Sequence, residues 1–126
     1  MPHLILEYSN NLAAQFKPQE LLAELHQTLA YTGVVKLAGI KSRAIGYDIY
    51  RVAEGDPAYG FVHLTLQIGH GRDLETRRQL GEKVFEVLQK TFAPVFEKGY
   101  CSLSLEVQEL HPDLNFKMNN LHGRER

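Results

Sequence analysis

The chain has 126 residues, of which 44% are hydrophobic, and its formal net charge is −1. This length fits one domain, residues 1–126, and this composition excludes a disordered chain. No apolar run is long enough to span a membrane, and no basic block indicates a nucleic-acid partner. The single cysteine, Cys101, excludes an internal disulfide and favours a reducing compartment. No secretory signal is visible, so the expected location is the cytoplasm.

The first half of the chain predicts a strand, a helix and a second strand. Residues from His3 to Tyr8 alternate in polarity, as in a strand with one buried face. A helix is predicted to begin at Pro18, whose ring suits the first helical position, and to end near Gly33. The stretch from Ile40 to Val52 is predicted as a strand in which Gly46 marks a bulge.

The second half repeats this order. Alternation predicts a strand from Phe61 to Ile68, and a second helix follows with Asp73 as its N-cap and Gly99 at its end. Pro94 is expected to kink this helix or to begin a separate final turn. The stretch from Tyr100 to Leu110 is predicted as the fourth strand.

These elements predict an α/β (α+β) fold built from tandem β-α-β units. Four strands form one mixed sheet, both helices cover one of its faces, and a short strand over residues 114–119 is added near the C-terminus. The opposite face of the sheet is too apolar to remain in contact with water as one patch. Association of subunits is the simplest way to cover it.

Pro2 directly follows the initiator methionine and precedes the first strand. Enzymes that remove this methionine accept a small second residue, so Pro2 is expected to become the N-terminus. Its nitrogen is then a secondary amine. Burial or neighbouring cations lower the pKa of an α-amino group from about 8 towards neutrality, where it suits proton transfer. The alternative interpretation is that Pro2 only begins a strand.

Several short segments are spaced as in one known enzyme family. They are Met1–His3 with Ile5 and Glu7, Leu37–Ile40 with Ser42–Arg43, Phe61–His63 with Thr65–Leu66, Ile68–Gly69, Gly71–Arg72, Leu74–Glu75, Glu109–Pro112, Leu114–Lys117 and Asn119–Asn120. Over nearly its whole length the chain resembles the 5-carboxymethyl-2-hydroxymuconate isomerase family of the tautomerase superfamily. The resemblance implies a tautomerase-like fold, a homotrimer, and Pro2 as the catalytic general base and acid.

The resemblance also implies a reaction. It is the conversion of 5-carboxymethyl-2-hydroxymuconate to its conjugated 2-oxo-3-enoate isomer during the degradation of homoprotocatechuate, and it needs no cofactor. Two alternatives remain: a tautomerase that acts on another 2-oxo acid or enol, and a non-catalytic trimeric binding protein. A panel of substrates tests the first alternative, and an unprocessed N-terminus would favour the second.

Three cationic side chains are candidate ligands for the carboxylates of such a substrate. Lys41 and Arg43 are two residues apart in a strand, so they point to the same face, about 6.6 Å apart. Arg72 lies just before a predicted helix N-terminus, which favours anions, and its guanidinium can bind a carboxylate through two hydrogen bonds. The alternative for each is a solvated surface charge. The family usually has arginine where this chain has Lys41, which leaves the exact substrate open.

Four further side chains are given roles in packing or structure and not in the reaction. Phe116 is a candidate wall of the substrate pocket, with packing in a subunit interface as the alternative. His26 and His63 are interpreted as structural residues, and Cys101 as a small buried side chain. The six histidines lack the paired helical spacing of a zinc motif, so no metal site is predicted.

Overall fold

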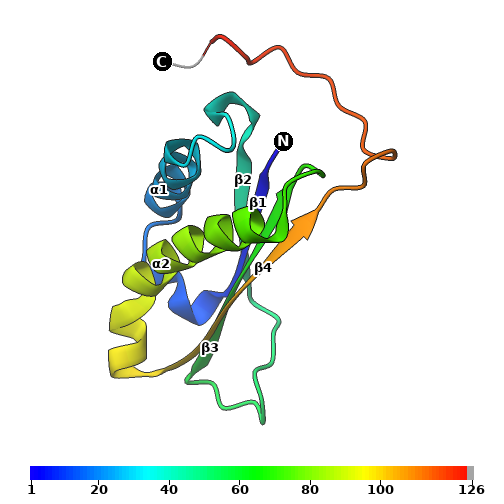
Figure 1. Ribbon diagram of the computed structural model, residues 1–126. Helices are drawn as coiled ribbons and strands as arrows, with labels where there is room; N and C mark the ends of the chain where they lie inside the picture. Colours follow the sequence, from blue (N-terminus) through cyan, green and yellow to red (C-terminus); the bar gives the residue numbers. More distant parts are fainter. Residues whose placement is uncertain (125–126) are drawn as a thin grey trace.

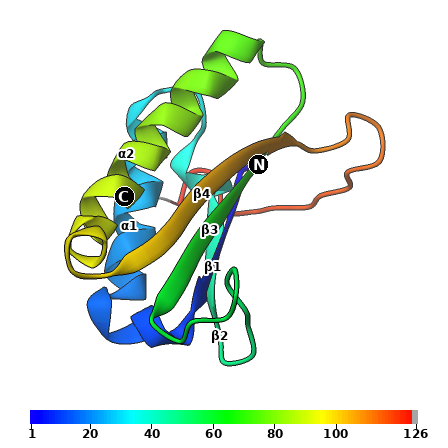
Figure 2. The same ribbon diagram turned by 90° about the horizontal axis from the view of Figure 1, so that it is seen from below.

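The computed structural model describes residues 1–124, which form a four-stranded sheet with two helices on one face (Figures 1 and 2). In chain order the elements are β1 (His3–Ser9), the 3₁₀ helix η1 (Asn10–Gln15), α1 (Pro18–Tyr31), the 3₁₀ helix η2 (Leu37–Gly39), β2 (Lys41–Tyr47), β3 (Tyr59–Ile68), α2 (Leu74–Lys98) and β4 (Tyr100–Glu109). The last two residues of the predicted domain, 125 and 126, lie outside the described residues. No described helix is both long and apolar enough to cross a membrane.

The sheet is mixed because two crossover units meet side by side in opposite directions. Its strand order is β2-β1-β3-β4. Helix α1 connects the parallel pair β1 and β2, and α2 connects the parallel pair β3 and β4. The central pair, β1 and β3, is antiparallel. The predicted tandem β-α-β plan is therefore confirmed, and it leaves β2 and β4 as open edges of the sheet.

The hydrophobic core lies between the sheet and the two helices. Side chains alternate along β3, so every second residue from Gly60 to Ile68 is buried and those between them face the other side. The largest contributions from the helices are the fully or almost fully buried side chains of Leu21, Leu25, Leu29, Leu80, Val84, Leu88 and Phe92. Because this side of the sheet is filled, the opposite side, here called the outer face, is the one available to other molecules.

The helix ends follow their local sequence signals. The Asp73 side chain accepts a hydrogen bond from the Thr76 backbone N–H at 2.8 Å, which confirms Asp73 as the N-cap of α2. Pro18 begins α1 as predicted. Gly33, just beyond the end of α1, has a φ of 75°, a conformation that glycine adopts without strain. Helix α2 continues through Pro94, so the alternative of a separate final turn is wrong.

Strand β2 is shorter than its sequence pattern predicts. It ends at Tyr47, opposite Ser9, where its neighbour β1 also ends, so no backbone partner exists beyond this point. Gly46 pairs in regular register with Tyr8, and the predicted bulge is absent. Ile49 is 95% exposed and lies in the following loop, not in the sheet.

The described C-terminal segment, residues 111–124, contains no strand, so the prediction of a short strand over residues 114–119 is wrong for the single chain. The segment leaves β4 and arches over the end of the sheet at which the chain begins (Figure 1). Strand geometry is stabilised by hydrogen bonds to a neighbouring strand, and the segment has no such neighbour within the described chain. Three of its apolar side chains are largely exposed: Leu114, Phe116 and Met118.

Candidate functional site

Pro2 is buried at the end of the sheet, immediately before β1. The backbone N–H of Lys41 donates to the Pro2 carbonyl oxygen at 3.0 Å, which extends the contact between β1 and β2 by one residue. Gly39 packs beside this position, because a methyl group added there would lie 3.8 Å from Pro2 Cδ. The strand pairing and the η2 turn therefore fix the position of the N-terminus.

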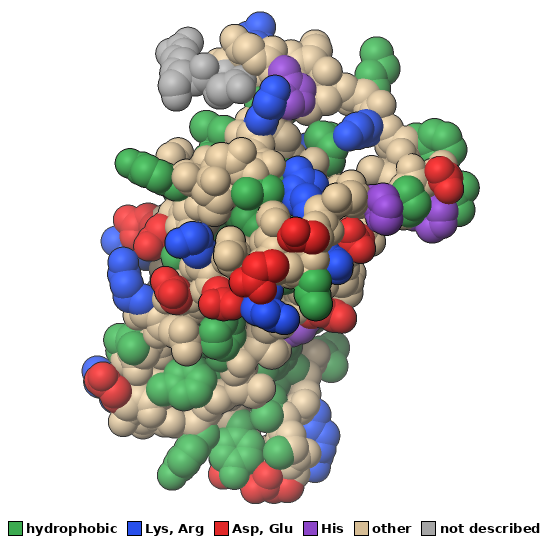
Figure 3. Space-filling model, in the orientation of Figure 1, with side chains coloured by type: hydrophobic (Ala, Val, Ile, Leu, Met, Phe, Trp, Pro, Cys, Tyr) green, Lys and Arg blue, Asp and Glu red, His purple; other side chains and the backbone are tan. Residues whose placement is uncertain are grey.

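The surroundings of the N-terminus lower the pKa of the Met1 α-amino group. Burial makes the largest contribution, and the positive charges of Lys117, Arg72 and Lys41 add to it in that order. These three cations come from the C-terminal segment, the loop before α2 and the start of β2. In Figure 3 several Lys and Arg side chains lie at this end of the molecule, beneath the C-terminal segment. An amine with a lowered pKa can accept a proton closer to neutral pH.

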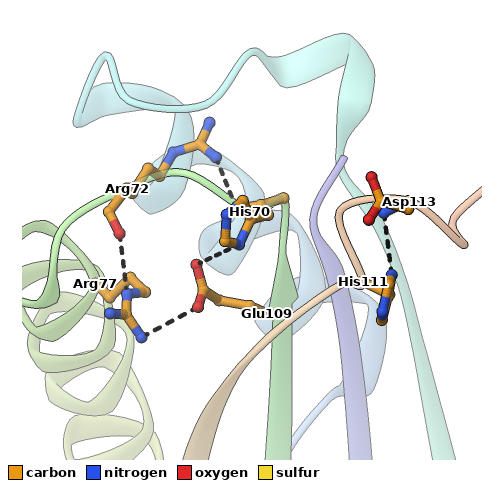
Figure 4. Close-up of polar contacts among 7 residues, drawn as sticks. His70, Arg72, Arg77, Glu109, His111 and Asp113 are labelled. Atoms are coloured by element: carbon orange, nitrogen blue, oxygen red, sulfur yellow. Dashed lines mark hydrogen bonds and ion pairs between the residues drawn. The ribbon is translucent and has the colours of Figure 1, made fainter.

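Arg72 is held in place by main-chain oxygens. Its guanidinium donates to the carbonyl of Gly69 at 3.2 Å and to the carbonyl of Val34 at 3.1 Å. Figure 4 shows the side chain extending from the loop that precedes α2. Its half-buried guanidinium has more N–H groups than these two contacts use, so it retains donors for an anion.

Lys41 and Arg43 take up different positions, although both lie on the outer face. Lys41 Nζ donates to the Gly39 carbonyl at 2.9 Å and lies 3.9 Å from the Met1 sulfur, so it belongs to the cluster around the N-terminus. Arg43 lies two residues further along β2, and its guanidinium contacts His3 Nδ1 at 3.1 Å. The structure therefore brings Lys41 and Arg72 to Pro2 and places Arg43 at the border of the cluster.

His3 is the side chain through which Arg43 contacts the N-terminal strand. Its pKa is lowered by burial first and then by the charges of Arg43, Lys41 and the N-terminus. A neutral imidazole accepts a hydrogen bond from Arg43, whereas a protonated one would repel it. His3 was not among the residues that sequence reasoning selected.

Phe116 does not reach the N-terminus within one chain. Its side chain is 87% exposed on the C-terminal segment. The adjacent Lys117 does act there through its charge, as described above. Sequence reasoning missed Lys117 as a site residue, and its only signal was its place in the family-like segment Leu114–Lys117.

The two histidines interpreted as structural are hydrogen-bonded to serines. His26 Nε2 lies 2.7 Å from Ser42 Oγ, and burial lowers the pKa of His26. His63 Nδ1 lies 2.6 Å from Ser104 Oγ. Cys101 is half-buried, and burial raises the pKa of its thiol, which disfavours the reactive thiolate. These contacts support the structural interpretation of all three side chains.

Comparison with solved structures first defines the class of fold. The macrophage migration inhibitory factor of Trichinella spiralis aligns with a TM-score of 0.66 at 12% identity, over 93% of this chain and 96% of that chain. A fused 4-OT, described as a symmetric trimer, aligns with a TM-score of 0.60 at 13% identity, over 85% of each chain. At these identities the fold alone is shared, and it is the fold of the tautomerase superfamily.

More similar relatives define the family. A 5-carboxymethyl-2-hydroxymuconate isomerase from Deinococcus radiodurans R1 aligns with a TM-score of 0.93 at 38% identity, over 99% of this chain and 94% of that chain. The 5-carboxymethyl-2-hydroxymuconate Delta-isomerase of Escherichia coli is 47% identical over 123 residues, which is 98% of each chain. The sequence model of the 5-carboxymethyl-2-hydroxymuconate isomerase family matches residues 2–125. The chain therefore belongs to this family.

Proposed function

We propose that this chain is a cofactor-independent isomerase that converts 5-carboxymethyl-2-hydroxymuconate to its conjugated 2-oxo-3-enoate isomer. Membership of the family supports this assignment. The structural observation that carries it is the environment of the N-terminus, where burial and then the charges of Lys117, Arg72 and Lys41 lower the pKa of the Met1 α-amino group, directly beside Pro2. These features are what a proton transfer on a polyanionic substrate requires.

In the proposed mechanism the Pro2 nitrogen, freed by removal of Met1, is the general base and acid. It takes the proton of the 2-hydroxyl group, the electron pair moves through the diene, and the protonated amine delivers a proton to C5. The C2–O bond becomes a carbonyl, and the remaining double bond lies between C3 and C4. Negative charge develops on the dienolate during the transfer, so nearby cations stabilise it.

The substrate has three carboxylates, and the described site offers several cations for them. We assign Arg72 and Lys41 to carboxylate binding beside Pro2, and Lys117 to the same cluster. Arg43 is assigned to a carboxylate at the border of the cluster, with His3 orienting its guanidinium. The neutral state of His3 supports this contact, because the lowered pKa keeps Nδ1 available as an acceptor.

The assignment is tested by ultraviolet spectroscopy on purified protein whose mass shows that Met1 has been removed. We expect the protein to accelerate ketonisation of 5-carboxymethyl-2-hydroxymuconate well above the rate in buffer. A matched panel of mono-, di- and tricarboxylate dienols tests the substrate class, and the tricarboxylate is expected to give the highest kcat/KM. Equal rates with and without the processed protein would remove the assignment.

We further propose that the enzyme is a cytoplasmic homotrimer. Ile45 on β2 and Tyr100 on β4 are 42% and 71% exposed, and their places in the strands assign both to the outer face. The exposed apolar side chains of the C-terminal segment need a similar cover. A neighbouring subunit can cover both, and it would also supply the strand partner that residues 114–119 lack. The cytoplasmic location rests on the single cysteine, Cys101.

Sedimentation velocity is expected to show a trimer at micromolar concentration. Phe116→Ser combined with Met118→Ser removes two of the most exposed apolar side chains and should raise the dissociation constant by at least about tenfold, since each buried methylene contributes about 0.8 kcal/mol. Tyr31→Ser is the matched control, because Tyr31 is 91% exposed on α1, on the helical side. A monomeric parent protein would refute the trimer. A double variant that dissociates no more readily than the control would refute the role of the segment.

A further inference from the structure

A second cluster of polar side chains lies next to the loop that carries Arg72. It consists of His70 in the loop before α2, Arg77 in the first turns of α2, and Glu109 at the end of β4 (Figure 4). Neither the proton transfer nor the carboxylate contacts proposed above use these three side chains. Their contacts nevertheless converge on the loop that carries Arg72.

Arg77 connects this loop to the sheet. Its Nε donates to the backbone carbonyl of Arg72 at 3.2 Å, and one of its terminal nitrogens lies 3.5 Å from Glu109 Oε1. The second oxygen of Glu109 lies 3.7 Å from His70 Nδ1, on the other side of Arg72 in the sequence. The side chains of Arg77 and Glu109 are only 30% and 28% exposed. Arg77 therefore connects the backbone of Arg72 to Glu109 at the end of β4, and Glu109 also lies beside His70 on the other side of Arg72.

The Arg72 loop contains a glycine directly before Arg72, so its backbone benefits from such support. Gly71 has a φ of 116°, a region open mainly to glycine, whose backbone is the least restricted of all residues. The Arg72 guanidinium itself is attached to the carbonyls of Gly69 and Val34. A backbone shift at Arg72 would move the guanidinium relative to the N-terminus, and a misplacement of about 1 Å can lower a rate by as much as about a hundredfold.

We propose that Arg77 and Glu109 are positioning residues for Arg72. Arg77 holds the Arg72 carbonyl while Glu109 fixes the orientation of Arg77, so the Arg72 guanidinium stays where a substrate carboxylate binds. Arg77 also compensates the charge of Glu109, an acidic side chain at the edge of a site that must attract anions. This inference rests on the proposed function of Arg72 as a carboxylate ligand.

A neighbouring ion pair provides the matched control. Arg78 lies 2.9 Å from Glu75, a shorter distance than that between Arg77 and Glu109, but both side chains are more than half exposed. Among the described residues, 1–124, the hydrogen bond and the ion pair of Arg78 both go to Glu75 and not to the Arg72 loop. An ion pair at the start of α2 could affect activity only by stabilising the helix. In that case Arg78→Ala would lower kcat/KM as much as Arg77→Ala does.

The test is a double-mutant cycle on kcat/KM for 5-carboxymethyl-2-hydroxymuconate. Arg77→Ala and Glu109→Gln are each measured alone and together with Arg72→Ala, with Arg78→Ala as control and thermal unfolding as a check of the fold. We expect each single variant to lower kcat/KM by about tenfold, and to lower it by less than about twofold when Arg72 is already absent. Arg78→Ala should stay within about twofold of the parent.

The proposal would be overturned if Arg77→Ala and Glu109→Gln lowered kcat/KM equally with and without Arg72. It would also be overturned if Arg77→Ala and Arg78→Ala lowered kcat/KM equally. If Arg77→Ala does not fold, Glu109→Gln carries the cycle alone, because it keeps the size of the side chain and removes only its charge. The same cycle is measured as binding of propane-1,2,3-tricarboxylate, which cannot tautomerise. A parent protein without isomerase activity whose binding still shows the coupling would refute the proposed reaction and support the positioning role.

Discussion

Pro2→Ala is expected to lower kcat by roughly a hundredfold in a chain whose initiator methionine has been removed, because general acid–base catalysis contributes about 10²–10⁴-fold. Alanine leaves a primary amine at nearly the same place, with altered basicity and geometry, so some activity should remain. KM should change less, because the proposed carboxylate ligands Arg72 and Lys41 remain in place. Steady-state ketonisation of 5-carboxymethyl-2-hydroxymuconate measures both constants.

Two controls make this result interpretable. Intact mass must show that Met1 is absent from each preparation, because an acylated Pro2 nitrogen is an amide without basicity and would imitate loss of the base. Pro94→Ala is the matched substitution, since Pro94 lies near the C-terminal end of α2, at the far end of that helix from Arg72. A fully processed Pro2→Ala protein that turns over substrate at the parent rate would show that proline is not the base.

Arg72→Ala is expected to lower kcat/KM by roughly ten- to a hundredfold, because a hydrogen bond to a charged group is worth about 1.5–3 kcal/mol. The loss should appear in both kcat and KM, since the role proposed for Arg72 is to bind a carboxylate and to stabilise the dienolate. It should shrink for substrates that lack the recognised carboxylate. Arg78→Ala removes an exposed cation from the same helix region and should leave kcat/KM unchanged. A loss of the same size for every substrate in the panel would contradict carboxylate recognition.

The pH dependence of the Arg72→Ala variant supplies a second readout. The base must be unprotonated in the free enzyme, so kcat/KM rises as the pH rises through the pKa of the amine. Arg72 contributes, after burial and Lys117, to the lowered pKa of the Met1 α-amino group. We expect its charge to act in the same way on the Pro2 nitrogen of the processed chain, so removing it should raise the pKa of that amine and move the acidic limb of the profile to higher pH. A limb that stays at the pH of the parent protein would indicate that Arg72 does not act on the base.

Local sequence signals predicted the elements well because each signal acts within a few residues. The alternation along β3 gave its buried face correctly, and Asp73 was identified as an N-cap from its residue type and place. The end of β2 was missed for a reason that no local pattern contains. A strand continues only while its neighbour offers backbone partners, and β1 stops at Ser9.

The candidate site was only partly predictable for the same reason. A proline that directly follows the initiator methionine can become an N-terminal secondary amine. This property depends only on residue type and position, so the sequence indicated Pro2 directly. Arg43 and Lys41 could be assigned to one strand face from their spacing. The different surroundings of the two side chains could not be predicted, because they depend on contacts with His3 and Gly39.

The sequence by itself predicted the order of elements, the mixed sheet with helices on one face and the family, and it led to the hypothesis that the Pro2 amine is the base. Tertiary structure alone decided which charges act on that amine. Lys117 is 115 positions from Pro2 in the chain, and it reaches the N-terminus because the segment after β4 arches back over the start of β1. Electrostatic effects depend on distance in space and on burial, and neither is present in the order of residues.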